Sequence, residues 1–108
     1  MILTNIESVP GYKIMSQFGL VSGSTVRAKN FVLDFGASLK NTFGGELKSY
    51  TELLVEARKE AVNRMKEQAQ LMGANAIINV RFATSAVTAG AAEVYAYGTA
   101  VKVAPIEG

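Results

Sequence analysis

The stretch Ser49–Gly73, SYTELLVEARKEAVNRMKEQAQLMG, predicts one long amphipathic helix around which the rest of the chain is organised. Ser49 and Glu52 form a capping box at its start. Gly73 suits the left-handed position that follows a helix. The apolar residues recur at three- and four-residue spacing and form one stripe: Tyr50, Leu53, Leu54, Ala57, Ala61, Met65, Ala69 and Met72. This stripe needs an apolar surface to cover it.

Two strands are predicted after the helix, at residues 74–83 and 93–103, and a loose connection of small residues lies between them at 84–92. One face of the last strand carries only small side chains near its middle: Ala96, Gly98 and Ala100. Such a face lets a helix backbone approach closely, so we place the long helix against it.

The opposite sheet face then holds the candidate oligomer interface: Asn79, Arg81, Tyr95 and Tyr97. Tyrosine and arginine are enriched at protein interfaces. The alternative is an ordinary half-exposed sheet surface whose polar tips lie in water.

Before the helix, Ile2, Leu3 and Ile6 favour a short edge strand that ends at a Pro10-Gly11 turn. Residues 12–28 are extended but are interrupted by two glycines, Gly19 and Gly23. They predict either one bent strand or a tight hairpin, and the pattern does not separate these alternatives.

Between this segment and the long helix, residues 30–42 carry apolar side chains at helical spacing and predict a short helix. Gly44-Gly45 then predicts a turn between the two helices. The expected fold class is therefore α+β, with a small, mostly antiparallel sheet packed on one long helix plus a short one.

Length and composition limit the function. The 108 residues allow a single domain spanning residues 1–108, with a net charge of +2 and no cysteine. The small charge does not favour nucleic acid or an anionic membrane as a partner, and the helix alternates its charges as a solvated face does. The chain has neither the signal-peptide pattern nor about 20 consecutive apolar residues, so we expect a cytoplasmic protein. One helix leaves strand edges and a sheet face uncovered, so we also expect self-association.

Several motifs resemble those of the YbjQ-like family of small bacterial and archaeal proteins. They are Ile2-Leu3-Thr4, Val9-Pro10-Gly11-Tyr12, Gly44-Gly45, Tyr50, Ala57-Arg58, Ala61, Leu71-Met72-Gly73-Ala74-Asn75-Ala76-Ile77 and Tyr97-Gly98-Thr99-Ala100-Val101. The resemblance covers nearly the whole chain in the same order. It implies a dodecin-like subunit that assembles into a homopentamer, with the sheets arranged around the ring. The family is commonly labelled as heavy-metal-binding.

The sequence has no set of residues that would bind the metal implied by that label. Soft metals select thiolates and imidazoles, and the chain has no cysteine and no histidine. The four thioethers are Met1, Met15, Met65 and Met72, of which the last two fall on the apolar helix stripe. The carboxylates Asp34, Glu46 and Glu52 have no spacing that marks a hard-cation site. We therefore identify no metal site and no cofactor.

Arg58 is the first candidate for ligand binding. It lies one turn from Leu54 at the border of the apolar stripe, so we expect it to be partly buried and to need a partner. That partner is either a carboxylate, such as Asp34 or a glutamate of a neighbouring subunit, or an anion bound together with Tyr50.

Three functional hypotheses follow. The first is a non-enzymatic homo-oligomer, expected to be a pentameric ring with a ligand-binding or purely structural role. The second is a binder of a metal or small ligand at the subunit interfaces. The third is an enzyme with a cleft at a subunit boundary, although the absence of histidine excludes a nucleophile–histidine pair.

Overall fold

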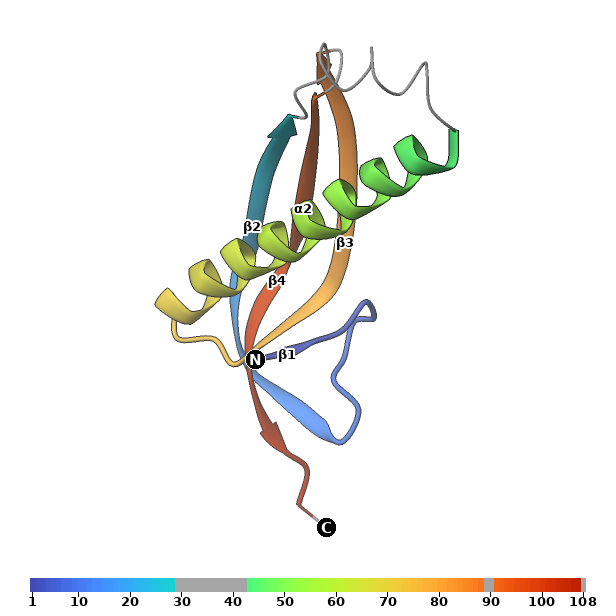
Figure 1. Ribbon diagram of the computed structural model, residues 1–108. Helices are drawn as coiled ribbons and strands as arrows, with labels where there is room; N and C mark the ends of the chain where they lie inside the picture. Colours follow the sequence, from blue (N-terminus) through green and yellow to red (C-terminus); the bar gives the residue numbers. More distant parts are fainter. Residues whose placement is uncertain (29–42, 89–90, 108) are drawn as a thin grey trace.

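The computed structural model describes residues 1–28, 43–88 and 91–107, with the backbone alone described at residues 28 and 43–50. The elements are β1 (Ile2–Leu3), β2 (Tyr12–Ala28), α2 (Phe43–Leu71), β3 (Ala76–Thr88) and β4 (Ala91–Pro105). The four strands form one sheet in the order β1-β3-β4-β2, in which β1 runs parallel to β3 and the other pairs are antiparallel. The α+β class and the mostly antiparallel sheet are confirmed, and α2 crosses one face of that sheet obliquely (Figure 1).

The helix begins earlier than its predicted cap. It includes Gly44 and Gly45, so the predicted Gly-Gly turn is wrong. Glycine costs about 1 kcal/mol per position in a helix but keeps its N–H donor, so two glycines weaken a helix without ending it. The predicted end is correct: Gly73 has φ of 90°, and the Ala74 N–H donates to Ala69 O at 3.0 Å. The short helix predicted at 30–42 lies outside the described residues.

The segment 12–28 is one bent strand and not a hairpin. It pairs with β4 along its whole length, with register shifts between Ile14 and Ser16 and between Gln17 and Gly19. Gly19 has φ of 105° and absorbs the second irregularity. Gly23 sits in regular register opposite Ala96, so no bulge forms there.

The loose connection predicted at 84–92 is wrong for its described residues, because 84–88 belong to β3 and 91–92 to β4. Pairing extends to Thr88 opposite Ala91. The backbone groups of these small and β-branched residues form hydrogen bonds with the partner strand. This stabilisation cannot be inferred from the residue pattern of one strand alone.

A bulge in β3 changes which side chains face the helix. Asn79 has φ of 53°, and the register moves from Ile78 opposite Thr99 to Arg81 opposite Tyr97. Ile77 and Val80 therefore both pack on the helix side, whereas Ile78 packs on the other side. Strict alternation along residues 74–83 would place Ala76, Ile78, Val80 and Phe82 on one face and Ile77, Asn79, Arg81 and Ala83 on the other, and it fails at this point.

The main core lies between α2 and the sheet. Its buried members are Val21, Ala57, Ala61, Met65, Ala69, Ala74, Ile77, Val94, Ala96 and Ala100. The predicted placement of the helix against Ala96 and Ala100 is confirmed. A second cluster on the opposite face forms where Val9 of the N-terminal segment covers Ala76, Ile78, Val101 and Val103.

The molecule is elongated. Its extents are 62 × 23 × 16 Å, and its radius of gyration is 17.9 Å, against about 13 Å for a compact domain of this length. The strands β2, β3 and β4 run on beyond the helix (Figure 1). In that half, every residue of β3 from 81 to 88 is exposed. No helix among the described residues is long and apolar enough to cross a membrane.

Candidate functional site

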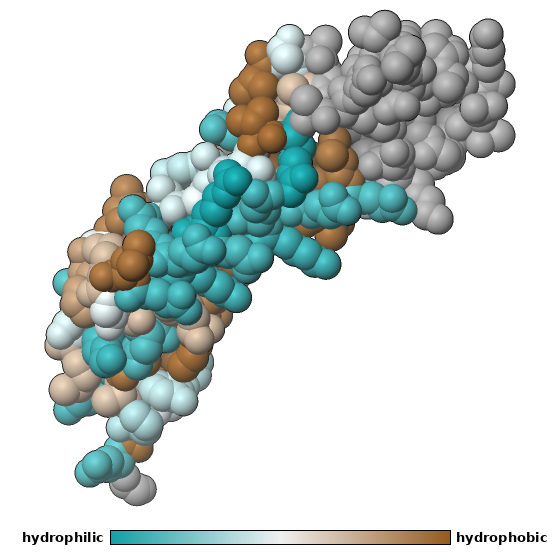
Figure 2. All heavy atoms as spheres, turned by 60° about the vertical axis from the view of Figure 1, so that its left-hand side comes forward, coloured by the Kyte–Doolittle hydropathy of each residue, from teal (hydrophilic) through white to brown (hydrophobic). Residues whose placement is uncertain are grey.

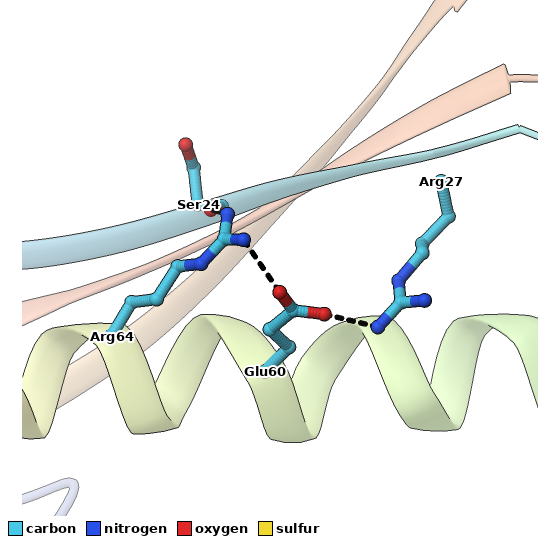
Figure 3. Close-up of polar contacts among 4 residues, drawn as sticks. All are labelled: Ser24, Arg27, Glu60 and Arg64. Carbon is cyan, nitrogen blue, oxygen red and sulfur yellow. Dashed lines mark hydrogen bonds and ion pairs between the residues drawn. The ribbon is translucent and has the colours of Figure 1, made fainter.

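The two flanks of α2 differ in their contacts with the sheet. The flank above β2 carries Glu60, which receives ion pairs from Arg27 of β2 and, at 2.5 Å, from Arg64 one turn along the helix (Figure 3). Arg64 also donates from Nη1 to the backbone oxygen of Ser24 at 2.6 Å. These ion pairs join helix and strand.

The same flank covers the edge of the sheet. β2 is an outer strand, and its Ser22 N–H donates to Oε1 of Gln68 at 2.7 Å. Together with the Arg64–Ser24 contact, this satisfies backbone groups that would otherwise offer pairing sites to another chain. The β2 flank of the helix is therefore occupied by contacts within the molecule.

The other flank of α2 faces β3 across a groove of about 450 Å³. Its lining residues are Arg58, Lys59, Val62, Asn63, Lys66 and Phe82. The helical residues share this flank because positions three and four apart lie on the same side of a helix. Three cations therefore border an apolar floor.

The cations of this groove have no anionic partner in the part of the chain that the structure describes. The ion pairs there are those of Glu60 with Arg27 and Arg64. We name Arg58, Lys59, Val62, Asn63, Lys66 and Phe82 the cationic groove.

Phe82 also borders a second hollow, of about 560 Å³, on its other side. This hollow is lined by Leu3, Thr4, Asn5, Ile6, Pro10 and Val80 together with Phe82. The N-terminal segment follows the β3 edge only as far as the bulge, where the Val80 N–H donates to Thr4 O at 2.9 Å. Beyond that point Phe82 is left half exposed.

The predicted interface residues divide into two groups. Tyr95 and Tyr97 lie on the sheet face opposite the helix, with ring centroids 5.4 Å apart. Arg81 is the cross-strand partner of Tyr97, and its guanidinium donates to Asn5 O at 2.7 Å. Asn79 is instead the bulge residue, whose N–H donates to Ile6 O at 2.9 Å.

The two predicted ligand residues are not brought together by any described contact. Arg58 is exposed and not partly buried, because the buried stripe follows Ala57 and Ala61, and position 58 lies about 100° around the helix from Ala57. Tyr50 lies in α2, but its side chain is outside the described residues, as is Asp34. The groove residues Lys59, Lys66 and Phe82 were missed. The shared helical flank of the lysines could have been found by spacing, and alternation already places Phe82 on the face of Val80, whereas the nearness of Phe82 to that flank depends on the tertiary fold.

The residues do not fit a heavy-metal site. Across the described ranges, no group of three or more His, Cys, Asp or Glu side chains is close enough to hold an ion, and the whole sequence has no Cys or His. Met65 is fully buried in the core, where it packs with Ala61 and Ala69. A thioether in such a core fills space.

Comparisons with known proteins agree over nearly the whole chain. A family model described as "Putative heavy-metal-binding" matches residues 1–104. A UPF0145 protein from Hahella chejuensis is 63% identical over 101 residues, which cover 94% of this chain and 97% of the relative. A UPF0145 protein from Methanoculleus marisnigri is 57% identical over 105 residues, which cover 97% of this chain and 98% of the relative.

One solved structure is similar in fold. It is a protein of unknown function of the DUF74 family from Pediococcus pentosaceus, with a TM-score of 0.52 and 19% identity, covering 96% of this chain and 98% of that one. At this identity the likeness concerns the fold alone.

Proposed function

The chain belongs to the YbjQ family, and from this premise we propose that it is a non-enzymatic subunit of a homo-oligomeric ring that binds a small ligand. The resemblance to the YbjQ-like family implies a dodecin-like subunit and makes five the expected number of copies. The cytoplasm is the expected compartment.

The single observation that carries the oligomer is the unfinished shape of one copy. A radius of gyration of 17.9 Å is far above the value of about 13 Å for a compact domain of this length. Large apolar side chains are exposed on the strands of the sheet. They include Leu20 and Val26 of β2 and Val87 of β3. In Figure 2 hydrophilic side chains run as a band across the middle of the molecule, and hydrophobic ones emerge on both sides of it. Neighbouring copies would cover such surface.

The interface we propose is the sheet face around Tyr95 and Tyr97. None of the other described elements packs on this part of the sheet, although Val9 covers the same face farther along it. Two tyrosine rings that lie 5.4 Å apart and are tilted by 32° supply a large contact area at low entropic cost. Arg81 lies beside them in register, with its guanidinium already held by the Asn5 backbone.

Among the ligand roles, a small organic molecule is favoured over a metal or a reaction. The cationic groove contains cations, an amide and apolar side chains but no carboxylate or nucleophilic hydroxyl. It therefore has no acid–base pair of the kind that most catalysis needs. A metal is disfavoured by the missing ligands.

Light scattering after size-exclusion chromatography tests the ring. We expect about 58 kDa at micromolar concentration, five times the 11.5 kDa of one chain. The double variant Tyr95→Glu/Tyr97→Glu should lower the mass, since it places charges in the proposed interface, whereas Lys102→Glu on the same strand should not. A folded monomer at micromolar concentration would overturn the proposal.

A further inference from the structure

The two flanks of α2 carry similar side chains but meet different surroundings. On the β2 flank, Arg64 and Gln68 bind the backbone of β2, and Glu60 is held by two arginines. On the β3 flank, Arg58, Lys59 and Lys66 border a groove and pair with no acid among the described side chains. The helix thus presents three cations to an open hollow.

These cations raise the local positive potential, and no acidic side chain lines the groove to offset it. Glu56 and Glu67 are exposed on the same helix, but neither lines the groove nor forms an ion pair there. Lys59 and Lys66 are two turns apart, about 10 Å along the helix axis. An anionic group that lies between them would interact favourably with both and would also be within reach of Asn63 as a hydrogen-bond donor.

The floor of the groove is apolar and partly aromatic. Phe82 is 50% exposed and shares the lining with Val62. A half-exposed phenyl ring is a stacking surface, and stacking of a flat ring on an aromatic side chain is worth about 1–3 kcal/mol in nucleic-acid complexes. The volume of about 450 Å³ falls within the range of small-molecule pockets.

We propose that the cationic groove binds a small molecule that has an anionic group at one end and a flat ring at the other. The ring lies on Phe82 and Val62, and the anion lies between Lys59, Lys66 and Arg58. This inference rests on the proposed small-ligand role but not on the ring assembly. A phosphate and a carboxylate share the required chemistry, and the test below distinguishes them.

Calorimetric titration of the full chain tests this with adenosine 5′-monophosphate, adenosine, inorganic phosphate and 2-naphthoate as probes. We expect at least one of the two probes that combine ring and anion to bind about tenfold or more tighter than adenosine or phosphate alone, because both ends of the site are then used. Binding of the nucleotide alone would identify a phosphate site, and binding of naphthoate alone a carboxylate site. Failure of both would overturn the proposal.

Variants separate the two ends of the groove. Lys59→Gln/Lys66→Gln should weaken the combined probe about tenfold and make its affinity less sensitive to salt. Phe82→Leu should weaken the combined probe while retaining most of the salt dependence. The matched control Lys102→Gln removes a cation from β4 outside the groove and should leave the affinity unchanged.

Two outcomes contradict the inference. If Lys59→Gln/Lys66→Gln weakens binding no more than Lys102→Gln does, the probe binds elsewhere. If that double variant changes the mass in light scattering while no probe binds the wild-type protein, a second copy occupies the groove. Because mass and affinity are measured on the same samples, failure of the ligand site is distinguishable from failure of the ring.

Discussion

Gly23 sets the distance between α2 and the sheet. A Cβ atom at this position would overlap the carbonyl oxygen of Ala61 and lie 2.5 Å from the Met65 nitrogen. Both are helix backbone atoms, which cannot move aside as the end of a flexible side chain can. The small face on β4 lets the helix lie on the sheet, and on β2 the helix backbone comes too close to leave room for a Cβ at position 23.

We therefore expect Gly23→Ala to lower the free energy of unfolding by about 1–3 kcal/mol, the usual cost of overpacking a core. Urea unfolding at fixed protein concentration measures this change. Ser22→Ala is the matched control, since the neighbouring side chain points to the other face while its backbone N–H keeps the bond to Gln68. Equal stabilities of the two variants would show that the helix does not lie this close to β2.

At the scale of elements, α2 protects one edge of the sheet and leaves the other edge partly open. Gln68 and Arg64 bind the backbone of β2 at Ser22 and Ser24. On the far side, β1 and the N-terminal segment follow β3 only to Val80. Glu60 and Arg27 are about a third exposed and Arg64 is half exposed, so each ion pair adds about 1 kcal/mol or less to stability. Their main effect is to orient Arg64 toward the strand.

Removing that protection should make β2 a pairing site. For the double variant Arg64→Ala/Gln68→Ala we expect faster aggregation on warming, because two edge backbone groups lose their partners. Turbidity and thioflavin fluorescence at matched concentrations measure the rate. Glu67→Ala/Gln70→Ala, at exposed helix positions without a contact to β2, is the control. Equal aggregation rates of the two double variants would contradict the protective role of Arg64 and Gln68.

At the scale of the whole molecule, one copy has more surface than its mass requires. Its accessible area is 6871 Å², against about 5,800 Å² for a compact monomer of this mass. The excess follows from a sheet that extends well beyond the helix that covers it. Association of copies would remove it and would add apolar burial at about 25 cal/mol per Å².

Because bound neighbours stabilise only the folded chain, the midpoint of thermal unfolding should rise with protein concentration. We expect an increase of several degrees over a hundredfold range, measured by scanning calorimetry. The variant Tyr95→Glu/Tyr97→Glu should lose this dependence while still unfolding cooperatively. A wild-type midpoint that is independent of concentration would contradict association through this face.

Part of the candidate site could be predicted from the sequence and part could not. Arg58 was selected from its place beside the apolar stripe, and the same spacing contains Lys59 and Lys66. Alternation places Phe82 on the face of Val80, as in the structure, but it places Ile78 there too, and the Asn79 bulge puts Ile78 on the other face. A residue with φ of 53° in a strand depends on the hydrogen bond to Ile6 O, which comes from a distant segment.

The sequence alone determined the properties that depend on local pattern or on composition. These are the helix end at Gly73, the apolar stripe and the absence of soft-metal ligands, since each follows from residue type or from spacing within a few turns. Tertiary structure alone decided that α2 begins before Gly44 and Gly45 and that β3 and β4 stay paired as far as Thr88 and Ala91. It brought the helix backbone close to Gly23. It also decided which helix flank binds the sheet and which borders an open groove. Those features depend on contacts between segments far apart in the chain, whose energies outweigh local propensity.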